Sequence, residues 1–191
     1  MKRKIKIIPF KRKRKGLTNY KKRKNLLLAR KPRLVIRRSL KSIMLQVVEY
    51  VPSGDKVVLS AHSNEISKLG WKMNGNNLPG SYLTGFLLGK KAAEKKIGEC
   101  ILDMGLYQSI KGNKIYAALK GAVDAGLKIP LSEEIFPSEE RIKGNHIAEF
   151  AKNTKGKDEY KNQFSAYTKN NVNPEAVSKH FDEIKQKIEG K

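Results

Sequence analysis

The sequence predicts an α/β protein: a three-layer α/β/α domain with a mixed sheet, extended by a long basic segment at the N-terminus and a helical segment at the C-terminus. Nineteen of the 41 Lys and Arg residues lie in residues 1–41, which contain no Asp or Glu. Short runs rich in β-branched residues follow between residues 33 and 62, separated by turn residues. Beyond residue 79, apolar residues recur at helical spacing and alternate with one more short apolar run.

The chain is expected to form one core domain with two extensions. With 39% apolar side chains, about 150 residues beyond the basic segment are enough for a single hydrophobic core. We therefore assign residues 1–31 to a basic RNA-binding extension and residues 32–150 to the α/β core. Residues 151–191 are assigned to a polar loop and a C-terminal amphipathic helix.

Two features bear on the environment of the protein. No apolar run approaches the roughly 20 residues that a membrane helix needs, and the N-terminus lacks a signal-peptide pattern, so we expect a soluble protein without a membrane partner. The single cysteine, Cys100, lies in an apolar run. It excludes an internal disulfide, argues against a Cys-based zinc site, and indicates cytosolic or nuclear residence.

The basic charge is local, because residues 42–191 contain 22 basic and 18 acidic side chains. Four basic clusters alternate with apolar and aromatic residues, at residues 2–6, 11–15, 21–24 and 30–38. Binding to phosphates releases condensed counterions, so this segment predicts a polyanion ligand. Charge repulsion predicts disorder before binding for residues 1 to about 15, and residues 17–30 are predicted to form a short helix.

The residue types of this extension suit RNA. Phe10 and Tyr20 can stack on unpaired bases, while Thr18 and Asn19 can hydrogen-bond to 2′-hydroxyls or base edges. Arginines are better candidates than lysines, because a planar guanidinium grips a phosphate with two N–H groups. The predicted RNA-binding residues are Lys11, Arg12, Lys13, Arg14, Thr18, Asn19, Tyr20, Arg23, Arg30, Lys31, Arg33, Arg37, Arg38 and Lys41.

Basic segments also have other uses. A run of this kind occurs in nuclear-import signals and in solvated tails, and a basic amphipathic helix can lie on a membrane. The length of the run favours nucleic-acid binding over the first two alternatives. The apolar face of the predicted helix is too small for the third.

The core is expected to begin at Pro32, which stops a preceding helix and biases Lys31 toward extended backbone. Residues 34–36 and 43–51 predict two strands that pair as a hairpin. Turn residues then lead to a third strand over residues 56–62, where the side chains alternate between two faces.

The pattern then changes to helical spacing. A helix is predicted from residue 79, in which Gly85 and Gly89 would allow close approach to the sheet. Residues 99–103 predict a short buried strand, and residues 115–126 a second amphipathic helix. This succession of strands and helices implies a parallel strand pair.

The C-terminal third has weaker signals. Ser132 and Ser138 each precede two glutamates and resemble helix starts, whereas the polar residues 151–172 are predicted to be a loop. Asn173 as N-cap and Pro174 in the first turn predict a last helix. Its apolar stripe should dock on the core, with a partner protein as the alternative; the stripe is Val177, Phe181, Ile184 and Ile188.

The sequence offers little for catalysis. The three histidines share no metal-ligand spacing, and there is no second cysteine to complete a metal site. Asp103 and Asp124 could serve as metal-binding carboxylates of a nuclease, which keeps a magnesium-dependent nuclease as an alternative. We expect no enzymatic activity, no metal and no cofactor.

Several stretches together resemble one family. The chain is similar to the 5S-rRNA-binding protein of the large ribosomal subunit, counted eighteenth in bacteria and fifth in eukaryotes, in its archaeal or eukaryotic form. The resemblance covers roughly residues 5–150 and departs at Asn19, where the family usually has Asp. The stretches that carry it are residues 9–14, 18–23, 31–35, 60–63, 79–85, 102–106, 117–130 and 141–149.

The resemblance implies a structural, non-enzymatic component of cytoplasmic ribosomes. Such a protein binds 5S rRNA and helps to attach it to large-subunit rRNA in the central protuberance, beside neighbouring large-subunit proteins. DNA and membranes are not expected partners. A free-standing RNA chaperone, which would bind many RNAs equally, remains the competing class.

Overall fold

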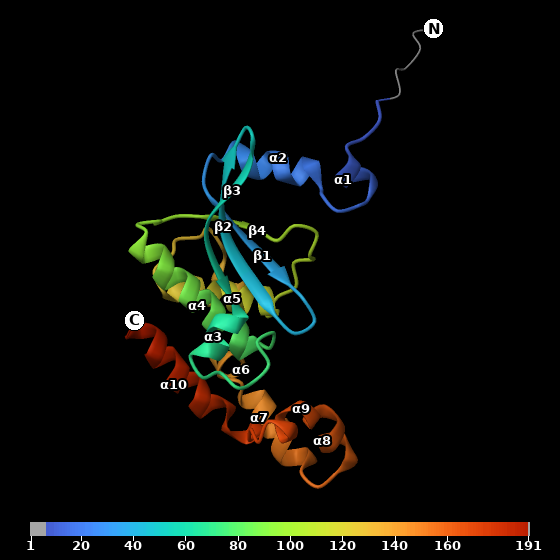
Figure 1. Ribbon diagram of the computed structural model, residues 1–191, viewed down its shortest axis with the longest axis vertical. Helices are drawn as coiled ribbons and strands as arrows, with labels where there is room; N and C mark the ends of the chain where they lie inside the picture. The colour runs from blue at the N-terminus through green and yellow to red at the C-terminus, as the bar shows by residue number, and fades with distance from the viewer. Residues whose placement is uncertain (1–6, 191) are drawn as a thin grey trace.

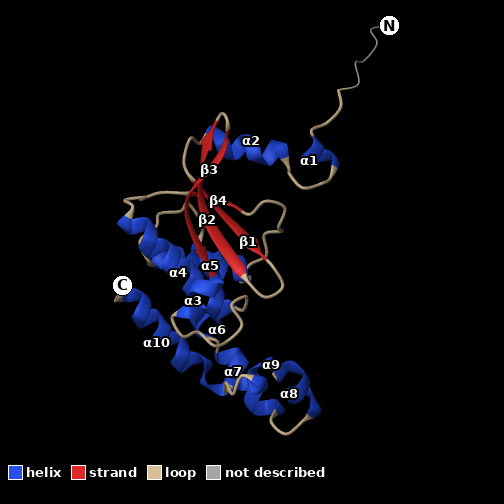
Figure 2. Ribbon diagram, viewed as in Figure 1, coloured by secondary structure: helices blue, strands red, loops and turns tan. Residues whose placement is uncertain are grey.

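The computed structural model describes residues 7–190 of the chain. It contains a four-stranded sheet, two long helices packed together, and a C-terminal helical lobe (Figures 1 and 2). The elements in order are α1 (Lys11–Arg14), α2 (Tyr20–Leu28), β1 (Arg33–Arg38), β2 (Ile43–Val51), β3 (Gly54–His62), α3 (Ser63–Lys68), α4 (Leu78–Glu94), β4 (Ile101–Asp103), α5 (Lys114–Asp124), η1 (Glu133–Ile135), α6 (Glu139–Lys143), α7 (Asn145–Thr154), α8 (Asp158–Gln163), α9 (Ser165–Lys169), η2 (Pro174–Ala176) and α10 (Val177–Glu189).

The sheet has the mixed topology that the sequence predicts. Its strand order is β3-β2-β1-β4, with antiparallel pairing of β1 with β2 and of β2 with β3. Strand β4 runs parallel to β1, with Leu34 opposite Leu102. The predicted hairpin, the three consecutive strands and the parallel pair are confirmed, and the protein belongs to the α/β class.

Strand side chains divide between two faces with a period of two residues. Leu34 and Ile36 of β1 and Leu45 and Val47 of β2 are fully or almost fully buried in the core. On the opposite face, Val35 and Gln46 are partly exposed and Arg37 is exposed. The second face of the sheet therefore carries polar and cationic groups.

Helices α4 and α5 pack at very short range through glycines. A Cβ atom on Gly85 would lie 1.7 Å from the Ala118 carbonyl oxygen of α5, and one on Gly121 would lie 2.1 Å from the Tyr82 carbonyl oxygen of α4. The prediction that Gly85 and Gly89 bring α4 close to the sheet is wrong, because both glycines face α5. Equal spacing of small residues does not specify which neighbour they face.

The expected loop at residues 151–172 is also wrong, since α7 extends to Thr154 and two short helices follow. Phe164, which is 4% exposed, organises this lobe. Its ring centroid lies 5.1 Å from that of Tyr160, 6.0 Å from that of Phe150 and 5.6 Å from that of Tyr167. A few aromatic residues in a polar stretch are thus sufficient to fold it.

The last helix agrees with its prediction. Asn173 accepts a hydrogen bond from the Glu175 N–H and caps η2, which leads directly into α10. All four residues of the apolar stripe are buried, and the ring of Phe181 lies 5.4 Å from that of Tyr82 on α4. Helix α10 therefore docks on the core.

Two lysines cover the free edge of β3. Lys91 belongs to α4, and Lys95 directly follows this helix. The Lys91 ammonium donates to the Ser60 carbonyl oxygen at 3.2 Å, and that of Lys95 donates to the Val58 carbonyl oxygen at 3.0 Å. Lysines along an edge strand oppose pairing with a further strand. The sheet consequently ends at β3.

The close α4–α5 contact predicts that a methyl group added at Gly85 strongly destabilises the fold. Gly85→Ala should lower the free energy of unfolding by about 3 kcal/mol, because overpacking against backbone outweighs the better helix propensity of alanine. Chemical denaturation would measure it. Gly98→Ala is the control, since a Cβ there meets nothing within 4 Å; equal stability of the two variants would contradict the packing.

Candidate nucleic-acid interface

The N-terminal segment has local structure of its own. The rings of Phe10 and Tyr20 lie 5.1 Å apart, and Arg12 Nε donates to Thr18 Oγ1 at 2.8 Å. Residues Lys11–Arg14 form one turn of helix, within the stretch for which the sequence predicts disorder before RNA binds. The cluster at residues 2–6, also expected to be disordered, lies outside the described residues.

Asn19 begins the second helix of this segment. Its side-chain oxygen accepts a hydrogen bond from the Lys22 N–H at 3.0 Å, which makes it the N-cap of α2. Asn and Asp are equally good N-cap residues. The departure from the usual Asp therefore preserves this local role.

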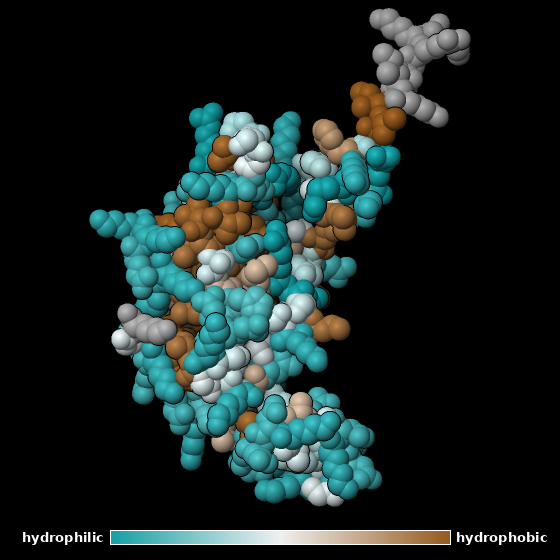
Figure 3. Space-filling model, viewed as in Figure 1, coloured by the Kyte–Doolittle hydropathy of each residue, from teal (hydrophilic) through white to brown (hydrophobic). Residues whose placement is uncertain are grey.

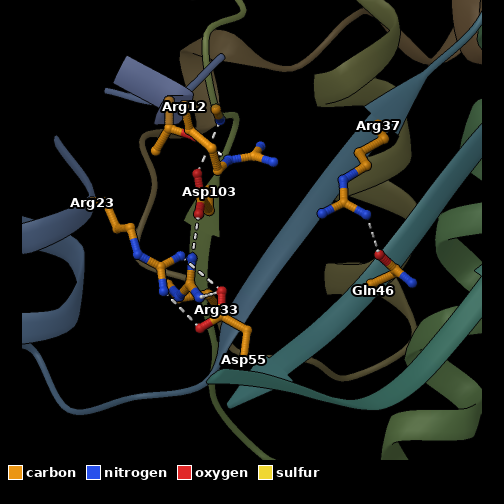
Figure 4. Close-up of polar contacts among 9 residues, drawn as sticks. Arg12, Arg23, Arg33, Arg37, Gln46, Asp55 and Asp103 are labelled. Atoms are coloured by element: carbon orange, nitrogen blue, oxygen red, sulfur yellow. Dashed lines mark hydrogen bonds and ion pairs between the residues drawn. The ribbon is translucent and has the colours of Figure 1, made fainter. Parts of the chain in front are cut away.

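Four charged side chains, which we term the anchor cluster, join α2 to the sheet (Figure 4). Arg23 of α2 makes two hydrogen bonds to Asp55 of β3, of 2.7 and 2.8 Å. Arg33 of β1 lies 2.8 Å from the same carboxylate and donates to Asp103 of β4 at 2.7 Å. The anchor cluster thus connects three strands and the basic extension.

Burial distinguishes the two arginines of the anchor cluster. The Arg33 side chain is 3% exposed and that of Arg23 is 29% exposed. A buried guanidinium requires carboxylate partners, because an unpaired charge is costly away from water. Arg33 therefore serves the fold, whereas Arg23 can still be reached by solvent.

The anchor cluster changes the acidity of Asp55. The hydrogen bonds from Arg23, which outweigh the opposing effect of partial burial, and the proximity of Arg33 lower the pKa of Asp55 from 3.8 to about 2. Because the folded-state pKa is depressed, the stabilisation is fully present above about pH 4 and is lost as the pH falls through about 2. With allowance for solvent screening, it amounts to about 1 kcal/mol.

A cleft of about 580 Å³ lies between the N-terminal segment, the second face of the sheet and the loop after β4. Arg12, Lys22 and Arg37 contribute cationic side chains to its walls. Exposed apolar groups lie beside them, since Leu17 is 53% and Leu106 is 56% exposed. This combination suits phosphates together with the faces of unpaired bases.

Polar contacts fix several of the cleft walls. Arg37 Nη1 donates to Gln46 Oε1 at 2.8 Å across the two central strands. Lys22 Nζ donates to the Gly105 carbonyl oxygen at 3.3 Å and so connects α2 to the loop after β4. Hydrogen bonds therefore fix Arg37 on the sheet side of the cleft and Lys22 on its α2 side.

Tyr107 adds an aromatic group at the edge of this cleft. Its hydroxyl donates to the Arg38 carbonyl oxygen at 3.1 Å, and the Arg38 guanidinium lies 4.9 Å from the ring centroid. A second groove, of about 400 Å³, runs between α2 and Tyr50 of β2 and also contains Tyr20. Sequence analysis identified neither Tyr50 nor Tyr107 as a candidate.

The structure brings together only part of the predicted set. Lys31 pairs with Glu99 beyond the end of α2, and Lys41 lies in the β1–β2 turn, away from the cleft. Exposed cations of α1 continue the basic surface, and Arg30 lines the second groove. The predicted residues that line the cleft are Arg12, Thr18, Asn19, Arg23, Arg33 and Arg37; those on α1 that extend its charge are Lys11, Lys13 and Arg14.

The acidic residues considered for a nuclease have protein partners. Asp103 is part of the anchor cluster, and its other oxygen accepts from the Gly105 N–H at 2.9 Å. Asp124 accepts from the Tyr82 hydroxyl at 2.8 Å and pairs with Lys120. Within residues 7–190, no three His, Cys, Asp or Glu side chains are placed to hold a metal ion.

The helices of residues 7–190 include none with the length and apolar character needed to cross a membrane. Exposed apolar side chains occur both on the N-terminal segment, where Ile7 is 84% and Ile8 75% exposed, and on the core domain, where Leu40 is 94% and Ile110 58% exposed. Figure 3 accordingly shows brown patches on the N-terminal segment and on the body of the domain. Most of the visible surface, including the C-terminal lobe, is hydrophilic.

Comparison with known families agrees with these features. Residues 4–98 and 91–132 match the family described as ribosomal large subunit proteins 60S L5 and 50S L18. The two matches overlap and together cover more than half of the chain. The chain belongs to this family. It is therefore a ribosomal protein of the large subunit, a component of a ribonucleoprotein that binds rRNA and acts in translation.

The family match includes the whole N-terminal segment that the structure describes, all four strands, α4 and α5. All members of the anchor cluster and every wall of the cleft fall inside the matched residues. The stretch at residues 141–149, which also carries the resemblance in sequence, lies beyond them. The C-terminal lobe is likewise outside the match.

The anchor cluster predicts a pH-dependent attachment of α2. At pH 7, Asp55→Asn should release α2 from the sheet, and the unchanged protein should release it between about pH 4 and pH 2. Amide NMR signals of α2 would report both changes. Signals of β1 and β2 serve as the reference for an intact fold.

The matched control is Asp158→Asn, because this carboxylate is 93% exposed and pairs with nearby Lys161 at 3.3 Å. It should leave the α2 signals unchanged. Signals of α2 that are insensitive both to pH and to the loss of Asp55 would contradict the anchoring role.

Proposed function

We propose that this large-subunit ribosomal protein binds 5S rRNA and helps to attach it to large-subunit rRNA in the central protuberance. The protein acts there as a structural constituent of cytoplasmic ribosomes, without enzymatic activity, beside neighbouring large-subunit proteins. The observation that carries the proposal is the cleft between the basic extension and the open face of the sheet. Membership of the family supports a ribosomal site for this cleft.

The charge distribution of the cleft favours a ligand that carries phosphates. No Asp or Glu occurs among residues 1–41, and the two carboxylates in the cleft walls, Asp55 and Asp103, are both engaged by arginines. The cations left available are exposed. Phosphates can therefore bind without competition from unpaired carboxylates, and their binding releases counterions.

The predicted arginines divide into two groups by their contacts. Arg23 and Arg33 hold the extension in place, and we assign them chiefly to positioning. Arg12, Arg14, Arg37 and Arg38 are exposed and are proposed to contact RNA directly. Tyr107 presents its ring beside Arg38, so a base or a phosphate can bind there with an aromatic neighbour.

RNA recognition favours loops and unpaired bases over the deep, narrow major groove of an A-form helix. The apolar side chains in the cleft, among them Leu17 and Leu106, fit such bases better than they fit a continuous duplex. Specificity for 5S rRNA would then arise from its folded loops, and affinity from the basic extension. An RNA chaperone would have the affinity that the basic extension provides but no specificity for 5S rRNA.

Filter binding to 5S rRNA and to a scrambled RNA of equal size tests the proposal. The full chain should prefer 5S rRNA at every salt concentration. Removal of residues 1–18 should flatten the dependence of log affinity on log salt by about 0.7–0.9 for each phosphate that these residues neutralise. This truncation keeps Arg23 and the anchor cluster intact.

Lys179→Ala, which changes an exposed lysine of α10, is the charge control and should leave the slope unchanged. Equal affinity for both RNAs would favour the chaperone. Degradation of the RNA in magnesium, abolished by Asp103→Asn, would favour the nuclease.

Tyr20 offers a separate test of base stacking. Tyr20→Ala should weaken binding to folded 5S rRNA about tenfold and affect scrambled RNA less, since stacking contributes about 1–3 kcal/mol per base. Ile110→Ala is the control, because it removes an exposed apolar side chain that lines neither the cleft nor the second groove. Competition filter binding with both RNAs gives the comparison, and equal losses on the two RNAs would contradict a stacking role.

A further inference from the structure

A further pocket, of about 330 Å³, shares no lining residue with the cleft. It is bounded by α3, by the loop of residues 70–77 and by α9 of the C-terminal lobe. Lys41 in the β1–β2 turn also lines it. Because β1 rises by about 3.3 Å per residue, this turn lies about 20 Å from the anchor cluster at the start of the strand (Figure 1).

The walls of this pocket are held by packing and hydrogen bonds. Trp71 is 2% exposed, and its Nε1 donates to the Asn74 carbonyl oxygen at 3.3 Å. The Asn74 N–H in turn donates to the Tyr167 hydroxyl at 3.4 Å, which connects the loop to α9. A Cβ on Gly75 would lie 2.7 Å from that of Ser63, so the loop is pressed against α3.

Tyr167 is also fixed from behind. Its ring meets that of Phe164 at 77°, with centroids 5.6 Å apart. Phe164 is the buried centre of the lobe. The pocket is thus preformed by the same aromatic contacts that fold residues 151–172.

The lining chemistry indicates a ligand. Lys41 and Lys72 are exposed cations, and no carboxylate occurs among the described residues that line the pocket. Asn64, Asn74 and Asn170 supply amides that both donate and accept hydrogen bonds. Ammonium groups suit a phosphate, while amides suit the edge of a base and hydroxyls such as that of Ser67 suit a 2′-hydroxyl.

We propose that this pocket is a second RNA site, which takes one unpaired nucleotide of rRNA. Lys41 and Lys72 bind its phosphate, and Asn74 and Asn170 read its base beside Tyr167. The inference rests on the proposed function, since it adds a second contact to a protein already bound to rRNA. Tyr167 and Asn170 lie outside the residues that match the family, so the pocket depends on the C-terminal lobe of this chain.

Two RNA sites with separate lining residues would let one protein hold two RNA segments. The nucleotide could belong to 5S rRNA or to large-subunit rRNA, and both sources present the same chemistry. A phosphate-bearing ligand is favoured over a protein segment, because the pocket offers two cations and no carboxylate among its described lining residues. The test below distinguishes the two RNA sources.

A tethered hydroxyl-radical probe can locate the RNA. The one native cysteine, Cys100, is 0% exposed and burial raises its pKa to about 11, so it does not compete for a thiol-directed probe. Ala166→Cys would carry the probe in the pocket wall, and Lys24→Cys would carry it on α2. Lys157→Cys, on the lobe but outside the pocket, is the control.

The expected result is cleavage at discrete nucleotides from Ala166→Cys, at sites different from those cut from Lys24→Cys. Complexes would be made with 5S rRNA alone and with large-subunit rRNA added, and the RNA that is cut identifies the source. Cleavage from α2 without cleavage from the pocket on either RNA would overturn this inference and leave the proposed function standing. Cleavage from neither position would overturn both.

An affinity measurement gives an independent readout. Lys41→Ala combined with Lys72→Ala should weaken binding of the RNA that is cut by about tenfold at physiological salt and lower the salt slope by about 1–2. Lys152→Ala combined with Lys157→Ala removes the same charge from the lobe outside the pocket and should have a smaller effect. Equal losses from the two double variants would overturn the pocket as a site.

Discussion

The pairing of Arg23 and Arg33 with Asp55 and Asp103 is the interaction on which the arrangement of the basic extension depends. Residues 1–41 contain nineteen Lys and Arg and no Asp or Glu, so mutual repulsion of these cations opposes a fixed arrangement of the segment. Two carboxylates overcome this repulsion at one place, where β1, β3 and β4 meet α2. They convert a charged tail into one wall of a cleft.

The same cluster has an energetic cost. Arg33 is almost completely buried, and its Nε has no hydrogen-bond partner among the described residues. A buried ion pair contributes modestly to net stability, but loss of one partner leaves an unpaired charge that is strongly destabilising. The anchor cluster therefore contributes little to the free energy of unfolding. It favours one position of the extension, since any other position would leave the buried Arg33 guanidinium without Asp55 or Asp103 as a partner.

Local sequence patterns were sufficient for most of the fold and for part of the site. β-branched runs, turn residues and helix caps identified the strands, α4, α5 and α10, because each signal lies within a few residues. The fold of residues 151–172 was missed since Phe164 and its aromatic neighbours are too few to form a stripe. The basic extension was predictable from composition, whereas its anchor was not, because the Arg23–Asp55 and Arg33–Asp103 contacts join residues 32 and 70 apart.

The lysines along the edge of β3 bear on the protein before it meets RNA. An uncovered edge strand is a template on which a second copy can add its own strand. Here the carbonyls that such a strand would need already accept from Lys91 and Lys95, and the incoming chain would have to displace two ammonium groups. Before the protein binds RNA, these lysines therefore hinder pairing of β3 with a strand of another molecule, and with it the formation of a continuous intermolecular sheet.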